Sequence, residues 1–171
     1  AGVVYNLSKE NPYKKSKLMP ELYPYEFDGK KFFQIQVGGG FGYKNMEAEI
    51  GGKYGVFAMY TNFMKQVSFK SRLGVGFDIS YDGTDKKLIE DGGGEVESFW
   101  PVVKTGGTIG REMMMSKVSL VFNTGGYFSG AYKNEGGIYE KLAIWYYFNS
   151  NVYASLTLKA HYARADYITF G

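Results

Sequence analysis

The stretch that decides the fold is Ser68-Phe69-Lys70-Ser71-Arg72-Leu73-Gly74-Val75-Gly76-Phe77-Asp78-Ile79-Ser80-Tyr81. Its side chains alternate in polarity with a period of two, which is the period of a β-strand. Apart from Ser71, one face is apolar and carries Phe69, Leu73, Val75, Phe77, Ile79 and Tyr81. The other face carries Ser68, Lys70, Arg72, Gly74, Gly76, Asp78 and Ser80. The segment is long for a strand of a water-soluble protein, but it suits a tilted strand that crosses a membrane with its polar face inside a barrel.

The same alternation recurs in two other segments of the chain. The first has an apolar face of Phe33, Ile35, Val37, Gly39, Phe41 and Tyr43, opposite Gln34, Gln36, Gly38, Gly40 and Gly42. The second has an apolar face of Val152, Ala154, Leu156, Leu158, Ala160 and Tyr162, opposite Tyr153, Ser155, Thr157, Lys159 and His161. Repetition of one pattern at distant places favours a single sheet that turns the same face outward throughout.

Further strands are expected at Lys53–Met64, Val102–Met113, Val118–Phe128 and Ile138–Phe148, with a last one opening at Tyr167. The connections mostly alternate between tight (65–67, 114–117, 149–151) and long (44–52, 82–101, 129–137), whereas the final one, 163–166, is short. Short turns at one end and long loops at the other are typical of outer-membrane barrels, with the short turns in the periplasm. The sequence therefore predicts an all-β fold, an eight-stranded antiparallel transmembrane β-barrel. The polar segment after Asp82 is expected to be a mobile loop.

Composition agrees with this architecture and excludes several classes of protein. The chain of 171 residues contains 16 Tyr, 13 Phe and 24 Gly but only 4 Pro, which favours strands and tight bends. No run of roughly 18 apolar residues is present, so a membrane-spanning helix is not expected. The absence of Cys excludes disulfides and thiolate metal sites. A net charge of +3 gives no reason to expect a nucleic-acid partner.

Residues 1–31 differ from the rest and are expected to form an irregular N-terminal arm, followed by the barrel domain, residues 32–171. The arm contains Pro12, Pro20 and Pro24 and the basic run Lys14-Lys15-Ser16-Lys17. The last strand, from Tyr167 to Gly171, is too short for a full crossing, which needs roughly nine to eleven residues. Either the sequence stops inside that strand, or part of the arm, such as Gly2 to Leu7, closes the barrel.

Three stretches resemble a known family. They are the segment from Ser71 to Asp82, the run Gly110-Arg111-Glu112, and Leu156-Thr157-Leu158-Lys159-Ala160-His161-Tyr162-Ala163-Arg164-Ala165-Asp166. They are similar to outer-membrane lipid A deacylase-like proteins, often labelled acyloxyacyl hydrolases, of Bacteroidetes-type bacteria. The resemblance implies an eight-stranded barrel whose active members remove an acyl chain from lipid A. It also implies a His-x-Ser pair on one strand and a downstream acidic residue, with His as base and Ser as nucleophile.

The catalytic pattern that the resemblance implies is incomplete. His161 matches the His position, but Ala163 stands at the nucleophile position and has no hydroxyl to activate. Alternation also turns His161 inward, whereas an enzyme that acts on lipid needs its nucleophile towards the acyl chain. His161 is therefore expected to be catalytic only if the chain is an active deacylase. Otherwise it is an interior residue that is hydrogen-bonded to neighbours such as Lys159, Thr157 or an acid on an adjacent strand.

Alternation places several charged residues inside the barrel, and these are Lys70, Arg72, Asp78, Lys104, Glu112 and Lys159, together with His161. They can line a pore, but an eight-stranded barrel is narrow enough for side chains to fill, which favours a plugging ion-pair network. A single His without Cys argues against a metal site, and no cofactor is expected. The aromatic runs Trp145-Tyr146-Tyr147-Phe148 and Phe99-Trp100 are expected to form part of an interfacial girdle.

Three functions fit these observations. The favoured one is a non-catalytic barrel of the bacterial outer membrane that contacts outer-membrane lipid and lipopolysaccharide. Its arm and loops would contact other envelope proteins in a structural or accessory role. The alternative is a lipid A deacylase that releases an acyl chain from lipopolysaccharide. The third is a lipocalin-like barrel with a small apolar ligand, which requires the apolar face to point inward. The inward charges at Lys70, Arg72 and Asp78 argue against that third function.

Overall fold

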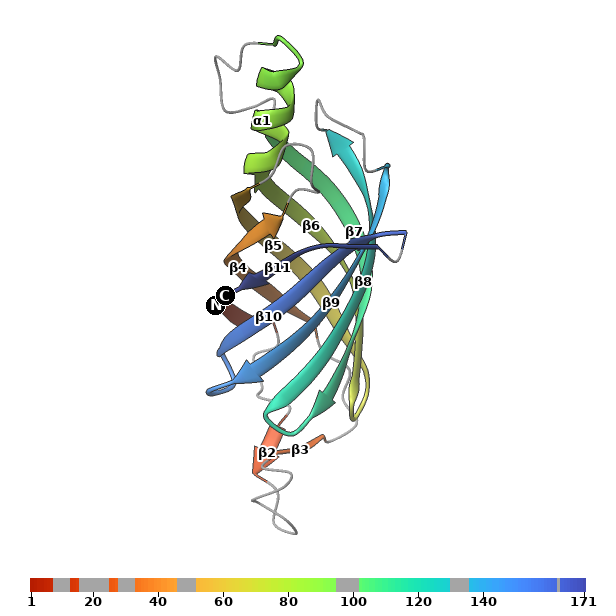
Figure 1. Cartoon of the computed structure of the whole chain (residues 1–171). Coiled ribbons are helices and arrows are strands. Elements are labelled where there is room, and N and C mark those ends of the chain that lie inside the picture. The colour runs from red at the N-terminus through yellow and green to blue at the C-terminus, as the bar shows by residue number, and fades with distance from the viewer. Residues whose placement is uncertain are drawn as a thin grey trace.

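The protein forms a closed antiparallel β-sheet. In the computed structural model (Figure 1), the described residues are 1–7, 13–15, 25–27, 33–45, 52–94, 102–129, 136–162 and 164–171. Nine of the described strands join in one antiparallel sheet, which closes in a ring of eight strands. The predicted eight-stranded barrel fold is therefore confirmed.

The strands follow one another around the ring in chain order. They are β4 (Phe33–Asn45), β5 (Lys53–Ser68), β6 (Ser71–Asp82), β7 (Val103–Met115), β8 (Val118–Ser129), β9 (Ile138–Tyr147), β10 (Val152–His161) and β11 (Arg164–Phe170). Each predicted strand corresponds to one of these, with ends that differ by a few residues. A separate two-stranded sheet, β2 (Tyr13–Lys15) and β3 (Tyr25–Phe27), lies at one end of the molecule in Figure 1.

Two short strands share the position that closes the ring. β1 (Gly2–Asn6) pairs with β4 through Val3↔Val37 and with β10 through Gly2↔Tyr153. β11 pairs with the same two strands further along the barrel. Phe170 pairs with Phe41 of β4 and with Leu156 of β10. The two chain ends meet between them, as the adjacent N and C marks in Figure 1 show. Of the two closures considered from the sequence, the N-terminal segment does complete the barrel, so the arm is not irregular over its first residues.

The two faces of the sheet have opposite chemistry, as the alternation predicts. The outward face carries exposed apolar side chains around the ring, among them Phe41, Phe63, Leu73, Val75, Phe77, Ile79, Ile109, Phe122, Leu142, Ile144, Leu156 and Ile168. The inward face carries buried polar and charged side chains, among them Gln34, Gln36, Asn62, Arg72, Asp78, Lys104, Glu112, Asn123 and Lys159. This is the reverse of the arrangement that a lipocalin-like carrier of an apolar ligand requires.

The two ends of the barrel differ in how the strands are connected. At one end, here called the turn end, tight turns join β5 to β6 at Phe69–Lys70 and β7 to β8 at Ser116–Lys117. The β9–β10 connection, residues 148–151, lies at the same end. The opposite end, here called the loop end, carries the longer connections, although β10 and β11 are separated there by only two residues. The alternation of short and long connections, with its short exception, is therefore as predicted.

A helix lies at the loop end, where the sequence was expected to form a mobile loop. α1 (Gly83–Asp91) follows β6 directly and projects from that end of the barrel in Figure 1. Asp82 caps it, because its Oδ1 accepts a hydrogen bond from the backbone N–H of Thr84 at 2.9 Å. The i,i+4 pairs Lys86–Glu90 and Lys87–Asp91 support its exposed side. In the described part of the chain, no helix combines the length and hydrophobicity that crossing a membrane demands.

Candidate functional site

The buried carboxylate of Glu112 organises the interior at the turn end. Its Oε2 accepts hydrogen bonds from Arg72 Nη1 at 2.9 Å and from Gln36 Nε2 at 2.8 Å. Its Oε1 accepts from the hydroxyl of Tyr147 at 2.8 Å. Arg72 Nε donates in turn to Gln66 Oε1 at 2.8 Å. Because β4, β5, β6, β7 and β9 each contribute one partner, this network ties most of the ring together across its centre.

A second network surrounds Asp78 in the middle of the barrel. Its carboxylate accepts from Lys141 Nζ at 2.6 Å and from the Tyr139 hydroxyl at 2.8 Å. Lys159 lies nearby, with its ammonium 4.4 Å from the ring centre of Tyr139 and 5.4 Å from that of Tyr167. Ring faces attract a cation, so aromatic side chains stabilise Lys159 where it is shielded from water.

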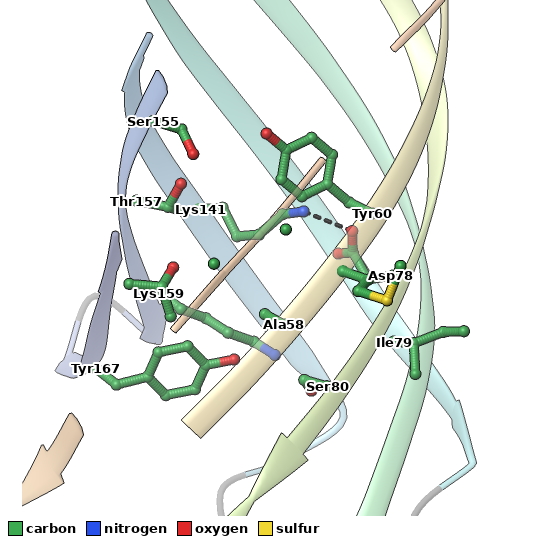
Figure 2. Close-up of a pocket in the computed structure, with 14 residues that line it drawn as sticks. Ala58, Tyr60, Asp78, Ile79, Ser80, Lys141, Ser155, Thr157, Lys159 and Tyr167 are labelled. Carbon is green, nitrogen blue, oxygen red and sulfur yellow. Dashed lines mark hydrogen bonds and ion pairs between the residues drawn. The ribbon is translucent and has the colours of Figure 1, made fainter. Parts of the chain in front are cut away.

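The space left between these side chains is small. Figure 2 shows a cavity lined by Asp78 on one side and by Ser155, Thr157, Lys159 and Tyr167 on the other, with Lys141 reaching across to Asp78. Its volume is about 30 Å³, which accommodates one or two water molecules but not an acyl chain or a sugar. At this level of the barrel the side chains therefore leave little free space, as expected for a ring of eight strands.

The described interior is also balanced in formal charge. Five cationic side chains and five carboxylates form its ion-pair networks or lie beside them, and these are Lys44, Arg72, Lys104, Lys141 and Lys159 with Asp78, Asp82, Asp85, Glu112 and Asp166. A buried charge without a partner is costly, and opposite charges at short distance compensate that cost. The balance is the arrangement of a plug rather than of a pore selective for one sign of charge.

An ion pair joins the helix to the barrel at the loop end. Asp85, in the first turn of α1, lies with its Oδ2 2.8 Å from Lys104 Nζ of β7. Asp85 is only 2% exposed and Thr84 only 1%, so the start of α1 is inserted into the end of the barrel. Lys44 of β4 also contacts Asp82, with Nζ 3.2 Å from Oδ2.

His161, the candidate base, points into the barrel near this end. Its Nε2 lies 3.0 Å from the Tyr127 hydroxyl, and its Nδ1 lies 3.4 Å from Asp166 Oδ2. Its exposed fraction is 7%, so it does not reach the outer face of the sheet. A hydroxyl, an imidazole and a carboxylate are thus in the order used in nucleophilic catalysis, but the hydroxyl is a phenol inside the barrel. Ala163, at the nucleophile position of the motif, lies outside the described residues.

An aromatic stack lies in the interior between the Glu112 and Asp78 networks. It contains Trp145, which was expected in the interfacial girdle. Trp145 is 2% exposed and stacks on Tyr153 at 4.4 Å and on Tyr60 at 5.8 Å between ring centres. It therefore faces the interior rather than the membrane interface. The next residue, Tyr146, is exposed on the outer face, as expected of a girdle residue. Phe99 and Trp100 lie outside the described residues.

The structure places six of the seven residues expected inside the barrel at buried positions, namely Arg72, Asp78, Lys104, Glu112, Lys159 and His161. Lys70 is the correction, because it lies in the tight turn after β5 and is exposed. The alternating pattern does not apply to Lys70, because the pairing of β5 with β6 ends at Ser68↔Ser71 and Lys70 lies in the turn beyond it.

Sequence reasoning missed several partners of these residues. Tyr139, Lys141 and Tyr147 lie on β9, whose range was predicted but whose inward face was not assigned. The sequence does indicate this inward face, because the outward residues Ile138, Leu142 and Ile144 alternate with Tyr139, Lys141 and Tyr147. The alternating pattern does not predict the contact between Asp166 and His161. That contact depends on the register shift in the pairing of β10 with β11.

No group of three or more His, Asp or Glu side chains in the described residues could hold a metal ion. The described interior thus offers the ion-pair networks and the His161 cluster, defined as His161, Tyr127 and Asp166.

Comparisons with known proteins give one match. The family model for the C-terminal domain of acyloxyacyl hydrolase matches residues 32–171. The comparisons with curated proteins and with solved structures returned no match. The matched region contains β4 to β11 and α1, and it includes every residue of the interior networks. By this match over most of its length, the chain belongs to the acyloxyacyl hydrolase family.

Proposed function

We propose that this chain is an integral protein of the bacterial outer membrane that has a structural or accessory role in the envelope and does not hydrolyse lipid A through His161. The observation that carries the proposal is the distribution of polarity over the closed sheet, with apolar side chains outside and paired charges inside. Lipid provides no hydrogen-bond partners for the backbone, and a closed ring of strands satisfies its own. Its outer surface then requires the apolar cover that the described strands have.

The position of His161 supports the non-catalytic part of the proposal. Lipid A presents its acyl chains to the outer surface of a membrane barrel, whereas the His161 side chain is buried inside the barrel. The family's nucleophile position is Ala163, and alanine cannot attack an ester. The imidazole is held between Tyr127 and Asp166, which gives His161 a structural role in joining β8, β10 and β11.

Insertion into a membrane is tested by refolding the full chain into phospholipid vesicles and comparing its mobility on SDS gels before and after boiling. We expect a compact band that shifts on boiling and a requirement for detergent or lipid throughout purification. A folded and monodisperse preparation in buffer alone would contradict the membrane assignment.

Catalysis is tested by mass spectrometry of lipid A incubated with the purified, refolded protein. We expect the lipid A to keep all its acyl chains for the wild type and for His161→Ala, with boiled protein as the blank. Acyl release by the wild type that is lost in His161→Ala would overturn the non-catalytic assignment.

Deacylation of lipid A remains the second candidate because of one specific contact. The Tyr127 hydroxyl lies 3.0 Å from His161 Nε2, where a nucleophile would stand in a triad with Asp166. Activity lost in both Tyr127→Phe and His161→Ala, and retained in the surface variant Lys87→Gln, would favour this candidate.

A further inference from the structure

Two cationic side chains interrupt the apolar outer face of the barrel towards the turn end. Lys65 lies on β5 between the exposed side chains of Phe63 and Val67. Arg111 lies on β7 between those of Ile109 and Met113. A formal charge with apolar neighbours on both sides is unfavourable in hydrocarbon and marks a position with a specific partner.

Strand pairing places the two cations in one row across the sheet. Lys65 pairs with Leu73 of β6, and Leu73 pairs with Arg111 of β7. Adjacent strands lie about 4.8 Å apart, so the two Cα atoms are roughly 10 Å apart with one exposed leucine between them. Both side chains therefore reach a similar depth relative to the turn end.

Neither charge is neutralised by a carboxylate of the described residues. The Nε of Arg111 donates to Ser71 Oγ at 2.9 Å, and the terminal guanidinium N–H groups of this exposed residue form no ion pair among the described residues. The ammonium of Lys65 lies 5.3 Å from the ring centre of Phe33 on β4, an arrangement that keeps the charge on the outer surface. Arg72, Lys104 and Lys141 in the interior, by contrast, each form an ion pair with a carboxylate, so the outer pair is available to an external anion.

We propose that Lys65 and Arg111 bind the phosphate groups of anionic phospholipids in the leaflet that surrounds the turn end. This inference rests on the proposed membrane insertion and adds the depth and the lipid class to it. Long cationic side chains extend along an apolar surface until their charges reach the headgroups, where phosphate is the abundant anion. The planar guanidinium of Arg111 can form paired hydrogen bonds to one phosphate, whereas Lys65 acts as a point charge.

The position of the pair towards the turn end indicates which of the two leaflets it meets. The turn end of outer-membrane barrels faces the periplasm, where the leaflet consists of phospholipid. Lipid A carries phosphate too, but it belongs to the leaflet at the loop end. The proposal therefore predicts a preference for phosphatidylglycerol rather than for lipid A.

The experiment uses the full chain in mixed micelles, with native mass spectrometry of the lipids that remain bound. The probes are phosphatidylglycerol, phosphatidylcholine and purified lipid A, each at the same concentration. The test variant is Lys65→Gln with Arg111→Gln. The matched control is Lys86→Gln with Lys87→Gln, which removes two charges from the exposed side of α1.

We expect the wild type and the control to retain phosphatidylglycerol over phosphatidylcholine by roughly five-fold for each cation. The test variant is expected to retain the two lipids equally. An unchanged preference in the test variant, an equal loss in the control, or stronger retention of lipid A by the wild type would each overturn the proposal. Heat-dependent gel mobility is measured on the same samples, so a failure to insert is distinguished from a failure to select the lipid.

Discussion

Asp85 of α1 lies with its carboxylate 2.8 Å from the ammonium of Lys104 on β7, and both side chains are almost fully buried. The ion pair joins the first turn of the helix to the inside of the barrel, so the start of α1 is anchored at the loop end while the rest of the helix projects from it. Opposite charges that are shielded from water interact more strongly than the exposed pairs on the other side of the same helix.

Removal of this contact is expected to loosen the helix and leave the barrel intact. In Asp85→Asn the ammonium of Lys104 loses its carboxylate, so we expect trypsin to cleave after Lys86 and Lys87 several-fold faster than in the wild type. The measurement is a time course of limited proteolysis with mass spectrometry of the fragments. Glu90→Gln removes one charge from the same helix without touching the contact, and its cleavage rate should match the wild type. Equal acceleration in both variants would show that Asp85 does not hold the helix.

The network around Glu112 is expected to contribute strongly to stability. In Glu112→Gln the guanidinium of Arg72 stays buried without its carboxylate, which should lower the free energy of unfolding by about 3–5 kcal/mol. Urea titration in phospholipid vesicles, followed by tryptophan fluorescence, measures the change. The exposed variant Glu90→Gln should stay within about 0.5 kcal/mol of the wild type.

A double variant separates loss of the ion pair from loss of packing. Arg72→Met with Glu112→Leu removes both charges, so it should be less destabilised than Glu112→Leu alone. A double variant that is at least as unstable as that single one would mean that the hydrogen bonds of Gln36 and Tyr147, rather than the unpaired charge, dominate.

The destabilisation caused by a charge on the outward face should depend on the depth of that position in the membrane. Phe77 lies in the middle of β6 with its side chain exposed, and Phe77→Arg is expected to destabilise the inserted barrel by about 2–4 kcal/mol. Tyr43 lies towards the loop end of β4, where Tyr43→Arg should cost about 0–1 kcal/mol. Urea titration in vesicles compares the two. Similar costs for both variants would contradict a lipid belt that is centred near Phe77 and leaves Tyr43 close to its edge.

Most of the barrel could be predicted because its strongest signal is local. The segment around Val75 alternates in sequence with the same period as its side chains alternate in space, so inward and outward faces follow directly. Arg72, Asp78, Glu112 and Lys159 were placed inside for this reason. Their partners could not be named, because register around a closed ring depends on pairings between strands far apart in sequence.

Two of the differences between prediction and structure, at α1 and at Trp145, occur where alternation gives no signal or is outweighed by residue type. α1 has few apolar residues, so the amphipathic pattern of its sequence is weak. The cap at Asp82 and the i,i+4 charge pairs indicate the helix more clearly. Trp145 follows the inward parity of Tyr139 and Lys141, but aromatic residues near a strand end were assigned to the membrane interface by residue type. Parity is the better guide there, because one strand position can face only one side.

The orientation of Trp145 gives the most direct test of the faces. Because Trp145 stacks between Tyr60 and Tyr153 inside the barrel, its fluorescence should be insensitive to brominated acyl chains in the surrounding lipid. The measurement uses Trp100→Phe, which leaves Trp145 as the single tryptophan. The matched control adds Trp145→Phe and Tyr146→Trp, which moves the indole by one residue to the outer face, where brominated lipid should quench it strongly. Strong quenching of Trp145 itself would mean that the faces of β9 are reversed. In that case Lys141, which shares its face, would point into lipid and lose its contact with Asp78.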